Sequence, residues 1–227
     1  GVVALSSPAE KKALERSINT LKSLNYNIIL ANNVFADGPM YLAGSDQDRV
    51  NGLHDLLKNP EVDLIMCTKG GYGTPRLTNL IDDALIKQHP KPIIGYSDVS
   101  YILNLIHHHT GLITYHGPMV CGDFDQDYQE AMFNNLKDVL NQTTYRYDFN
   151  TYDKVETIID GTSEGKLIGG NLCLMSVLLQ ATGLDYFKDT ILLLEDGNEP
   201  LYELDRLLMT LSIGGVFKHV NGVMIGE

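Results

Sequence analysis

The sequence predicts an α/β fold, with an N-terminal domain built on a parallel sheet flanked by helices and a second, smaller mixed α/β domain. Short apolar runs alternate with stretches of helical periodicity, and glycine or polar residues separate them. Strands that alternate with helices favour a parallel sheet with right-handed crossovers. The length of 227 residues, with 44% hydrophobic residues, suits one large domain or two modest ones. We expect domains at residues 1–150 and 151–227.

In the first domain, the apolar runs predict strands and the periodic stretches between them predict helices. Ser6-Ser7-Pro8, Ser45 and Thr74-Pro75 are expected to cap three of these helices, because hydroxyls and proline favour helix starts. The elements expected in order are a strand at 2–5, a helix at 9–24, a strand at 27–30, a helix at 45–57, a strand at 63–67, a helix at 74–80, a strand at 93–94, a helix at 99–109 and a strand at 112–115.

The second half of the chain has a different pattern. Residues 128–140 predict a helix, while residues 144–149 and 155–159 alternate like antiparallel strands. The chain begins without methionine and ends within an apolar run, so we expect the natural protein to be longer and the C-terminal domain to be incomplete. The remaining expected elements are a helix at 172–179, a strand at 191–194, a helix at 202–211 and a strand at 223–225.

Composition narrows the possible partners. The formal net charge of −12 argues against nucleic acid, since phosphate binding needs clustered lysine and arginine. The three cysteines lie far apart and lack metal-ligand spacing, which indicates free thiols of a reducing compartment and therefore a cytoplasmic location. No apolar run approaches the ~20 residues of a membrane-spanning helix.

Ser97 stands between a predicted buried strand and a predicted helix. Ile93 and Ile94 form the apolar run, Gly95 suits a sharp bend, and helical spacing begins at Val99. A serine at such a turn lies beside helix-end N–H groups that favour an oxyanion, as in a nucleophile elbow. The elbow pattern G-x-S-x-G is not met, because Val99 replaces the last glycine. A plain helix cap is the competing interpretation, and the local sequence alone favours it.

Other candidate functional residues follow predicted strands. In open parallel sheets, ligands bind at the carboxyl ends of the strands. Gly70-Gly71-Tyr72-Gly73 allows close backbone approach and can present N–H groups to an anion. It matches neither common phosphate-binding pattern, so nucleotide phosphate is disfavoured. His116 and Glu195 also follow apolar runs, although a solvated carboxylate at a strand end is common. No metal or cofactor is implied.

Five ordered motifs together resemble the LD-carboxypeptidase family of serine peptidases, which includes the muramoyltetrapeptide carboxypeptidases of murein recycling. The resemblance covers essentially the whole chain, and it implies an N-terminal α/β domain joined to a C-terminal domain. The motifs are Gly70-Gly71-Tyr72-Gly73 with Arg76, Gly95-Tyr96-Ser97-Asp98, His116-Gly117-Pro118-Met119, Gly169-Gly170-Asn171-Leu172, and Leu194-Glu195-Asp196 with Glu199 and Arg206.

The resemblance implies a Ser-His-Glu triad in which Ser97 is the nucleophile and Glu195 orients the histidine. It also implies an oxyanion hole made by the backbone N–H of Asp98 and of a glycine in the Gly70-Gly71 pair, for which we select Gly71. The residues expected to surround the substrate are Gly70, Tyr72, His116 and Asn171.

The triad histidine is the main departure from the family pattern, because in the family it lies beyond the segment that matches this chain. His107, His108 and His109 close the helix that Ser97 opens, roughly 15 Å away along its axis, and suit a helix C-terminus. His116 is a candidate for the substrate surroundings only. Lys69 is a second departure, since arginine is more usual there and lysine lacks the planar fork that grips a carboxylate.

The resemblance therefore implies a cytoplasmic serine peptidase that removes the terminal D-alanine from murein tetrapeptides, with a small peptide as substrate, no nucleic-acid or membrane partner, and a homodimer by analogy. One alternative is a microcin C immunity-type hydrolase of peptidyl or aminoacyl nucleotides. Another is a non-catalytic ligand-binding relative that lacks the triad histidine.

Overall fold

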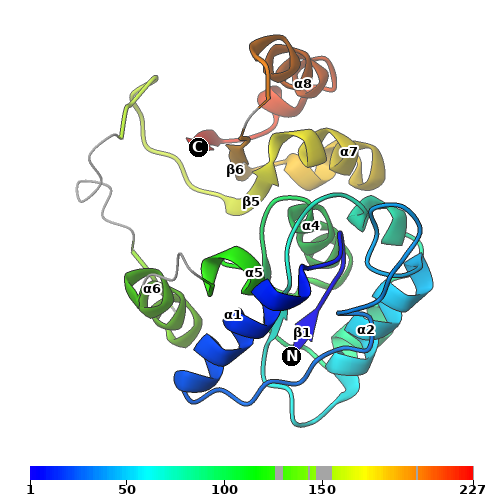
Figure 1. Ribbon diagram of the computed structural model, residues 1–227. Helices are drawn as coiled ribbons and strands as arrows, with labels where there is room; N and C mark the ends of the chain where they lie inside the picture. The colour runs from blue at the N-terminus through cyan, green and yellow to red at the C-terminus, as the bar shows by residue number, and fades with distance from the viewer. Residues whose placement is uncertain (126–129, 143, 147–154, 198, 227) are drawn as a thin grey trace.

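The computed structural model describes residues 1–125, 130–142, 144–146, 155–197 and 199–226. Two parallel sheets, each with helices packed against it, form the described structure (Figure 1). The predicted α/β class is therefore confirmed. No helix among these residues is long and apolar enough to cross a membrane.

The first sheet has the strand order β1-β2-β3-β4, and every neighbouring pair is parallel. In β2 and β3 every residue is buried, as expected for strands covered on both faces. Gly95 at the end of β3 pairs with His116 at the end of β4, so the residues that follow β3 lie beside His116. The strands are β1 (Val2–Val3), β2 (Ile65–Cys67), β3 (Ile93–Gly95) and β4 (Tyr115–His116).

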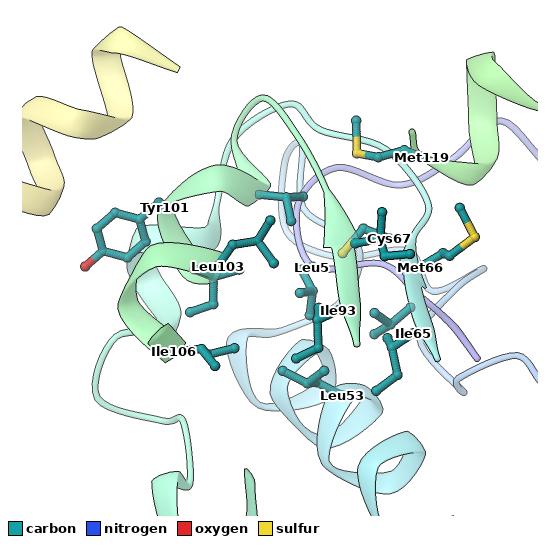
Figure 2. Packing of buried hydrophobic residues seen from close by; sticks show 14 of the residues in the cluster. Leu5, Leu53, Ile65, Met66, Cys67, Ile93, Tyr101, Leu103, Ile106 and Met119 are labelled. Carbon is teal, nitrogen blue, oxygen red and sulfur yellow. The ribbon is translucent and has the colours of Figure 1, made fainter. Parts of the chain in front are cut away.

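Helices cover this sheet and complete one apolar core. Leu53 of α2, Ile65 of β2 and Ile93 of β3 belong to a single cluster of buried side chains (Figure 2). Ser45 caps α2 as expected, and with Asp48 it forms a reciprocal capping box. The elements are α1 (Lys11–Ser23), α2 (Asp46–Lys58), the 3₁₀ helix η1 (Thr74–Leu77), α3 (Asp83–Gln88), α4 (Val99–Thr110), α5 (Val120–Asp123) and α6 (Glu130–Asn141).

The second sheet has the order β5-β6-β7 and is also parallel throughout. Its strands end together, because Asn171 pairs with Glu195 and Glu195 with Gly226. Helix α4 packs against α7 and β5, which joins the two halves of the structure. The elements are β5 (Lys166–Asn171), α7 (Leu172–Thr182), η3 (Leu184–Phe187), β6 (Thr190–Glu195), α8 (Leu201–Ile213), η4 (Val216–Lys218) and β7 (Gly222–Gly226).

Several local expectations were wrong. Residues 155–159 and 144–146 form no strand, and 147–149 lie outside the described residues, as does the predicted domain boundary at 150. An alternating pattern of apolar and polar side chains forms a strand only where a second strand is available to pair with it. Ile158 and Ile159 are largely exposed and do not cover a core. The expected strand at 27–30 pairs with β1 through a single bridge.

Two expected helix starts also differ from the structure. Helix α1 begins after Glu10 without a side-chain cap, so Ser6-Ser7-Pro8 does not cap it. The helix expected at 74–80 is the 3₁₀ turn η1, with Pro75 in its first turn. Ser6 and Thr74 both come after strands of the first sheet, and their hydroxyls form hydrogen bonds to Asp98 instead of capping helices.

Candidate active site

Ser97 occupies a sharp turn between β3 and α4. Its φ of +59° lies in the left-handed region, which is uncommon for any residue other than glycine. Such strain is typical of the elbow that presents a nucleophile above a sheet. The position that caps α4 is Asp98, with no side-chain capping hydrogen bond, so the interpretation of Ser97 as a plain helix cap was wrong.

Gly70 is the residue through which the glycine-rich loop, Gly70-Gly71-Tyr72-Gly73, contacts Ser97. A Cβ atom built on Gly70 would lie 2.8 Å from Ser97 Oγ and 3.6 Å from the backbone nitrogen of Asp98. Only glycine allows this backbone to approach the hydroxyl so closely. The structure thus brings together three residues that the sequence predicted for one site.

The carboxylate of Asp98 links the turn at Ser97 to the glycine-rich loop. It is buried, and its Oδ2 accepts hydrogen bonds from Ser6 Oγ at 2.6 Å and from the Thr74 N–H at 2.9 Å. Thr74 Oγ1 in turn donates to the Asp98 carbonyl at 2.6 Å. Charge-assisted bonds of this kind hold the end of β1, the glycine-rich loop and the elbow together. Ser6 and Thr74 were assigned to helix caps from the sequence, so their role here was missed.

A buried cation supports the far end of the glycine-rich loop. The Arg49 side chain is fully buried and donates to the Gly73 carbonyl at 2.9 Å and to the Leu5 carbonyl. Arg49 also pairs with Asp46, whose carboxylate forms a bidentate pair with Arg76 at 2.8 Å. These two arginines hold the pKa of Asp46 below its usual range, Arg76 making the larger contribution. Both arginine side chains are therefore held by ion pairs within the protein.

Tyr72 projects from the glycine-rich loop. Its side chain is 48% exposed and packs edge to face against Tyr41, with 5.9 Å between the ring centroids. Gly71, between Tyr72 and Gly70, lies against Ser7, because a Cβ at Gly71 would be 2.1 Å from Ser7 Oγ. Two exposed aromatic rings thus stand near the loop that touches Ser97.

Glu195 ends the middle strand of the second sheet and is half buried. Burial, reinforced by the neighbouring charge of Asp196, raises the pKa of Glu195. Within the described residues, Glu195 Oε1 and Asp196 Oδ2 are buried without a hydrogen-bond partner. Buried carboxylate oxygens normally have donors, so this pair presents unused acceptors to a further group.

His116 and Tyr96 lie between the two halves of the site. Their ring centroids are 6.2 Å apart, and a Cβ at Gly170 would lie 3.3 Å from His116 Nδ1. Desolvation lowers the pKa of His116, which favours the neutral ring. Desolvation also raises the pKa of Tyr96, and the charges of Asp123 and Glu195 add to this effect. The second sheet therefore faces the elbow across these rings.

The structure also places Asn171, Lys69 and the histidines other than His116. Asn171 caps α7 through its Oδ1, which accepts from the Leu174 N–H at 3.3 Å, and its predicted contact with substrate stays a prediction. Lys69 is half buried beside the glycine pair. His89 lies at the C-terminal end of α3. The side-chain contacts of the other histidines are His54 with the Asp82 N–H, His107 with Tyr186, His108 against Tyr186 and His109, His109 with Asp83, and His219 with the Gly215 carbonyl.

No group of three or more histidine, cysteine, aspartate or glutamate side chains in the described ranges is arranged to hold a metal ion. The arrangement instead offers a strained serine, a backbone N–H beside it and, among the described residues, a carboxylate with one buried oxygen that has no hydrogen-bond partner. This set is suited to acyl transfer once a base stands between Ser97 and Glu195.

Comparison with known proteins gives this geometry a context. Residues 1–117 match the LD-carboxypeptidase N-terminal domain, and residues 164–227 match the LD-carboxypeptidase C-terminal domain. The probable murein peptide carboxypeptidase of Bacillus subtilis is 34% identical over 229 residues, which cover 99% of this chain and 70% of that protein.

Two solved structures share the fold. The MccF-like protein from Bacillus anthracis strain Ames has a TM-score of 0.84 and 27% identity, covering 100% of this chain and 76% of that one. The muramoyltetrapeptide carboxypeptidase from Oxalobacter formigenes has a TM-score of 0.83 and 25% identity, covering 100% of this chain and 75% of that one. Since both domain models match and the Bacillus subtilis relative aligns over nearly the whole sequence, the chain belongs to the LD-carboxypeptidase family.

Proposed function

We propose that this protein is a serine carboxypeptidase that releases the terminal D-alanine from murein tetrapeptides. The observation that carries the proposal is the left-handed Ser97 at the end of β3, with Gly70 and the Asp98 N–H packed around its hydroxyl. Membership of the family supports a carboxypeptidase, and the names of two of the similar proteins refer to murein peptides or muramoyltetrapeptides.

In the proposed reaction, Ser97 Oγ attacks the carbonyl carbon of the bond to D-alanine while a histidine accepts the hydroxyl proton. The N–H groups of Asp98 and Gly71 stabilise the negative oxygen that forms. The histidine then gives its proton to the amine of D-alanine, and the C–N bond breaks. Water, activated by the same histidine, hydrolyses the acyl-serine ester. We place this histidine in the part of the family sequence that follows the segment matched here.

Glu195 would orient that histidine and stabilise its charged form. The supporting observations are its buried, partnerless Oε1 and its raised pKa, because an imidazolium nearby would both donate a hydrogen bond and offset the cost of burying the carboxylate. Neutral carboxyl groups could not provide this charge stabilisation. Glu195 therefore gains its full role only with the base in place.

The substrate would lie between the glycine-rich loop and the second sheet. Gly70 and Tyr72 would contact it from the loop, and His116 from the end of β4. Asn171 would contribute its remaining donor capacity, since its Oδ1 already caps α7. Lys69 offers a point charge for the substrate carboxylate, without the two-bond grip of an arginine.

The decisive test measures D-alanine released from a murein tetrapeptide by the full-length protein. Ser97→Ala should reduce turnover by at least 10³-fold, because it removes the nucleophile. Ser23→Ala is the matched control, since Ser23 lies on the exposed face of α1 and bonds only within that helix. Turnover by Ser97→Ala at the rate of the control would reject the proposal.

A microcin C immunity-type hydrolase remains the second candidate, and the 27% identical MccF-like structure is the observation that favours it. Rates measured side by side on a tetrapeptide and on an aminoacyl nucleotide analogue separate the two. Faster Ser97-dependent hydrolysis of the nucleotide analogue would select this alternative. Binding of either compound without any turnover would select the non-catalytic relative.

We also propose that the protein acts in the cytoplasm as a homodimer, with no nucleic-acid or membrane partner. Free cysteines and the acidic composition support the location and the absence of nucleic acid. Cell fractionation and light scattering of the full-length protein test these two points, and a membrane-bound or monomeric protein would contradict them.

A further inference from the structure

A glycine pair at the end of β5 allows the second sheet to lie directly against α4. Gly169 and Gly170 have φ values of +130° and +137°. A Cβ at Gly170 would lie 2.4 Å from Ser100 Cβ, and one at Gly169 would lie 1.9 Å from the Leu193 carbonyl oxygen. The pair thus permits a close approach to α4 on one side and to β6 on the other, which side chains would prevent.

Asn104 of α4 forms hydrogen bonds to the Gly169 backbone through both its amide nitrogen and its amide oxygen. The residue is 7% exposed, and its Nδ2 donates to the Ser100 carbonyl at 2.7 Å and to the Gly169 carbonyl at 2.8 Å. Its Oδ1 accepts from the Gly169 N–H at 3.1 Å and from the Tyr186 hydroxyl at 3.2 Å. An asparagine amide has two N–H donors and two acceptor lone pairs, so every one is used. The register between α4 and β5 is therefore fixed.

Ser100 makes a second link, one helical turn before Asn104. Its Oγ donates to the Ser97 carbonyl at 2.7 Å and accepts from the Asn171 N–H at 3.2 Å. Asn171 lies opposite Glu195 in the pairing of β5 with β6. One hydroxyl thus connects the backbone of the elbow to the strand next to the carboxylate.

We propose that Ser100 and Asn104 are positioning residues that hold Ser97 and Glu195 in one frame across the two sheets. Neither side chain is assigned a contact with the substrate. The proposal rests on the proposed function, because it concerns the alignment of the same two groups. A misplacement of about 1 Å can cost roughly 100-fold in rate, so such links matter even at a distance from the reacting atoms.

The first test compares kcat, KM and the thermal midpoint of full-length variants. Ser100→Ala and Asn104→Asp should lower kcat roughly 10- to 100-fold with KM within threefold. Asn104→Asp keeps the shape and the acceptor for the Gly169 N–H but removes the Nδ2 donor to the Ser100 and Gly169 carbonyls. Thr114→Val is the control, because the Thr114 hydroxyl also bonds to the backbone of α4, at Leu103, within the first domain. It should keep kcat within twofold.

A purely structural role would lower the thermal midpoint of Ser100→Ala and of the control alike and leave kcat of the folded protein unchanged. That result would overturn the proposal. If Asn104→Asp fails to fold, Ser100→Ala still decides, because it removes one hydroxyl and leaves Asn104 in place.

The second test is a double-mutant cycle between Ser100→Ala and Glu195→Gln. If Ser100 acts by aligning Ser97 with Glu195, its removal should cost at least fivefold less in kcat when Glu195 is already changed. Losses that multiply independently would overturn the positioning role while Ser97-dependent turnover still upheld the proposed function. Unchanged turnover in Ser97→Ala would instead reject the proposed function, and the positioning role with it.

Discussion

Substitution of Gly70 by alanine tests the geometry of the nucleophile most directly. The new methyl group would lie 2.8 Å from Ser97 Oγ and 2.9 Å from Ser97 Cβ, whereas ordinary contact begins at 3.4 Å. Rotation of the hydroxyl would leave the contact with Cβ in place, so Ser97 as a whole must move by about 0.5 Å. Gly70 is not among the glycines with a left-handed φ, so alanine introduces no backbone strain of that kind. A displacement of this size should reduce kcat/KM by roughly 10- to 100-fold.

The assay is D-alanine release by the full-length protein, combined with thermal unfolding. The crowding should cost at most about 1–3 kcal/mol of stability, so the variant should fold. Gly161→Ala is the control, since a Cβ there meets no atom within 4 Å and its φ is not left-handed. A folded Gly70→Ala protein with the kcat/KM of the control would refute the placement of Ser97 against the glycine-rich loop.

Three further outcomes follow from two buried groups and from a desolvated histidine. Asp98→Ala should lower the free energy of unfolding by about 3 kcal/mol in urea titrations, because Ser6 and Thr74 lose a charged acceptor; a change under about 0.5 kcal/mol would contradict this. Burial raises the pKa of the Cys67 thiol to about 12, so at pH 8 it should not react with a disulfide reagent until urea unfolds the protein. Desolvation lowers the pKa of His116, so unfolded chains bind its proton more readily and stability should fall as pH drops below ~6.5. His116→Gln should flatten that part of the unfolding profile, and an identical profile would count against the desolvation of the ring.

Features set by local chemistry could be predicted from the sequence. The hydroxyl of Ser45, just before a stretch of helical periodicity, predicts a helix cap, and the structure has Ser45 at that position. An apolar strand, a tight turn and helical periodicity placed Ser97 at a turn between a strand and a helix, because each signal lies within a few residues of the next. The same local sequence favoured a helix cap over a nucleophile elbow, and only the ordered motifs of the family indicated the nucleophile. The order of strands and helices likewise predicted a parallel sheet.

Contacts between distant segments could not be predicted in this way. The carboxylate of Asp98 binds Ser6 across 92 residues, and nothing near either residue signals the other. Arg49 is a charged residue on a helix, which is usually solvated, yet its guanidinium is fully buried against backbone carbonyls. The roles of Ser100 and Asn104 depend equally on where β5 docks.

The left-handed conformation of Ser97 has a consequence for how the protein can be stabilised. Holding a residue other than glycine there costs roughly 1–2 kcal/mol, and this must be offset by the packing of β3 and α4 around it. Substitutions that relax the elbow would therefore gain stability while losing the position in which the elbow holds the Ser97 hydroxyl. Robust variants of this enzyme are better sought in surfaces and loops remote from the turn, because at the turn itself durability and catalysis are in direct competition.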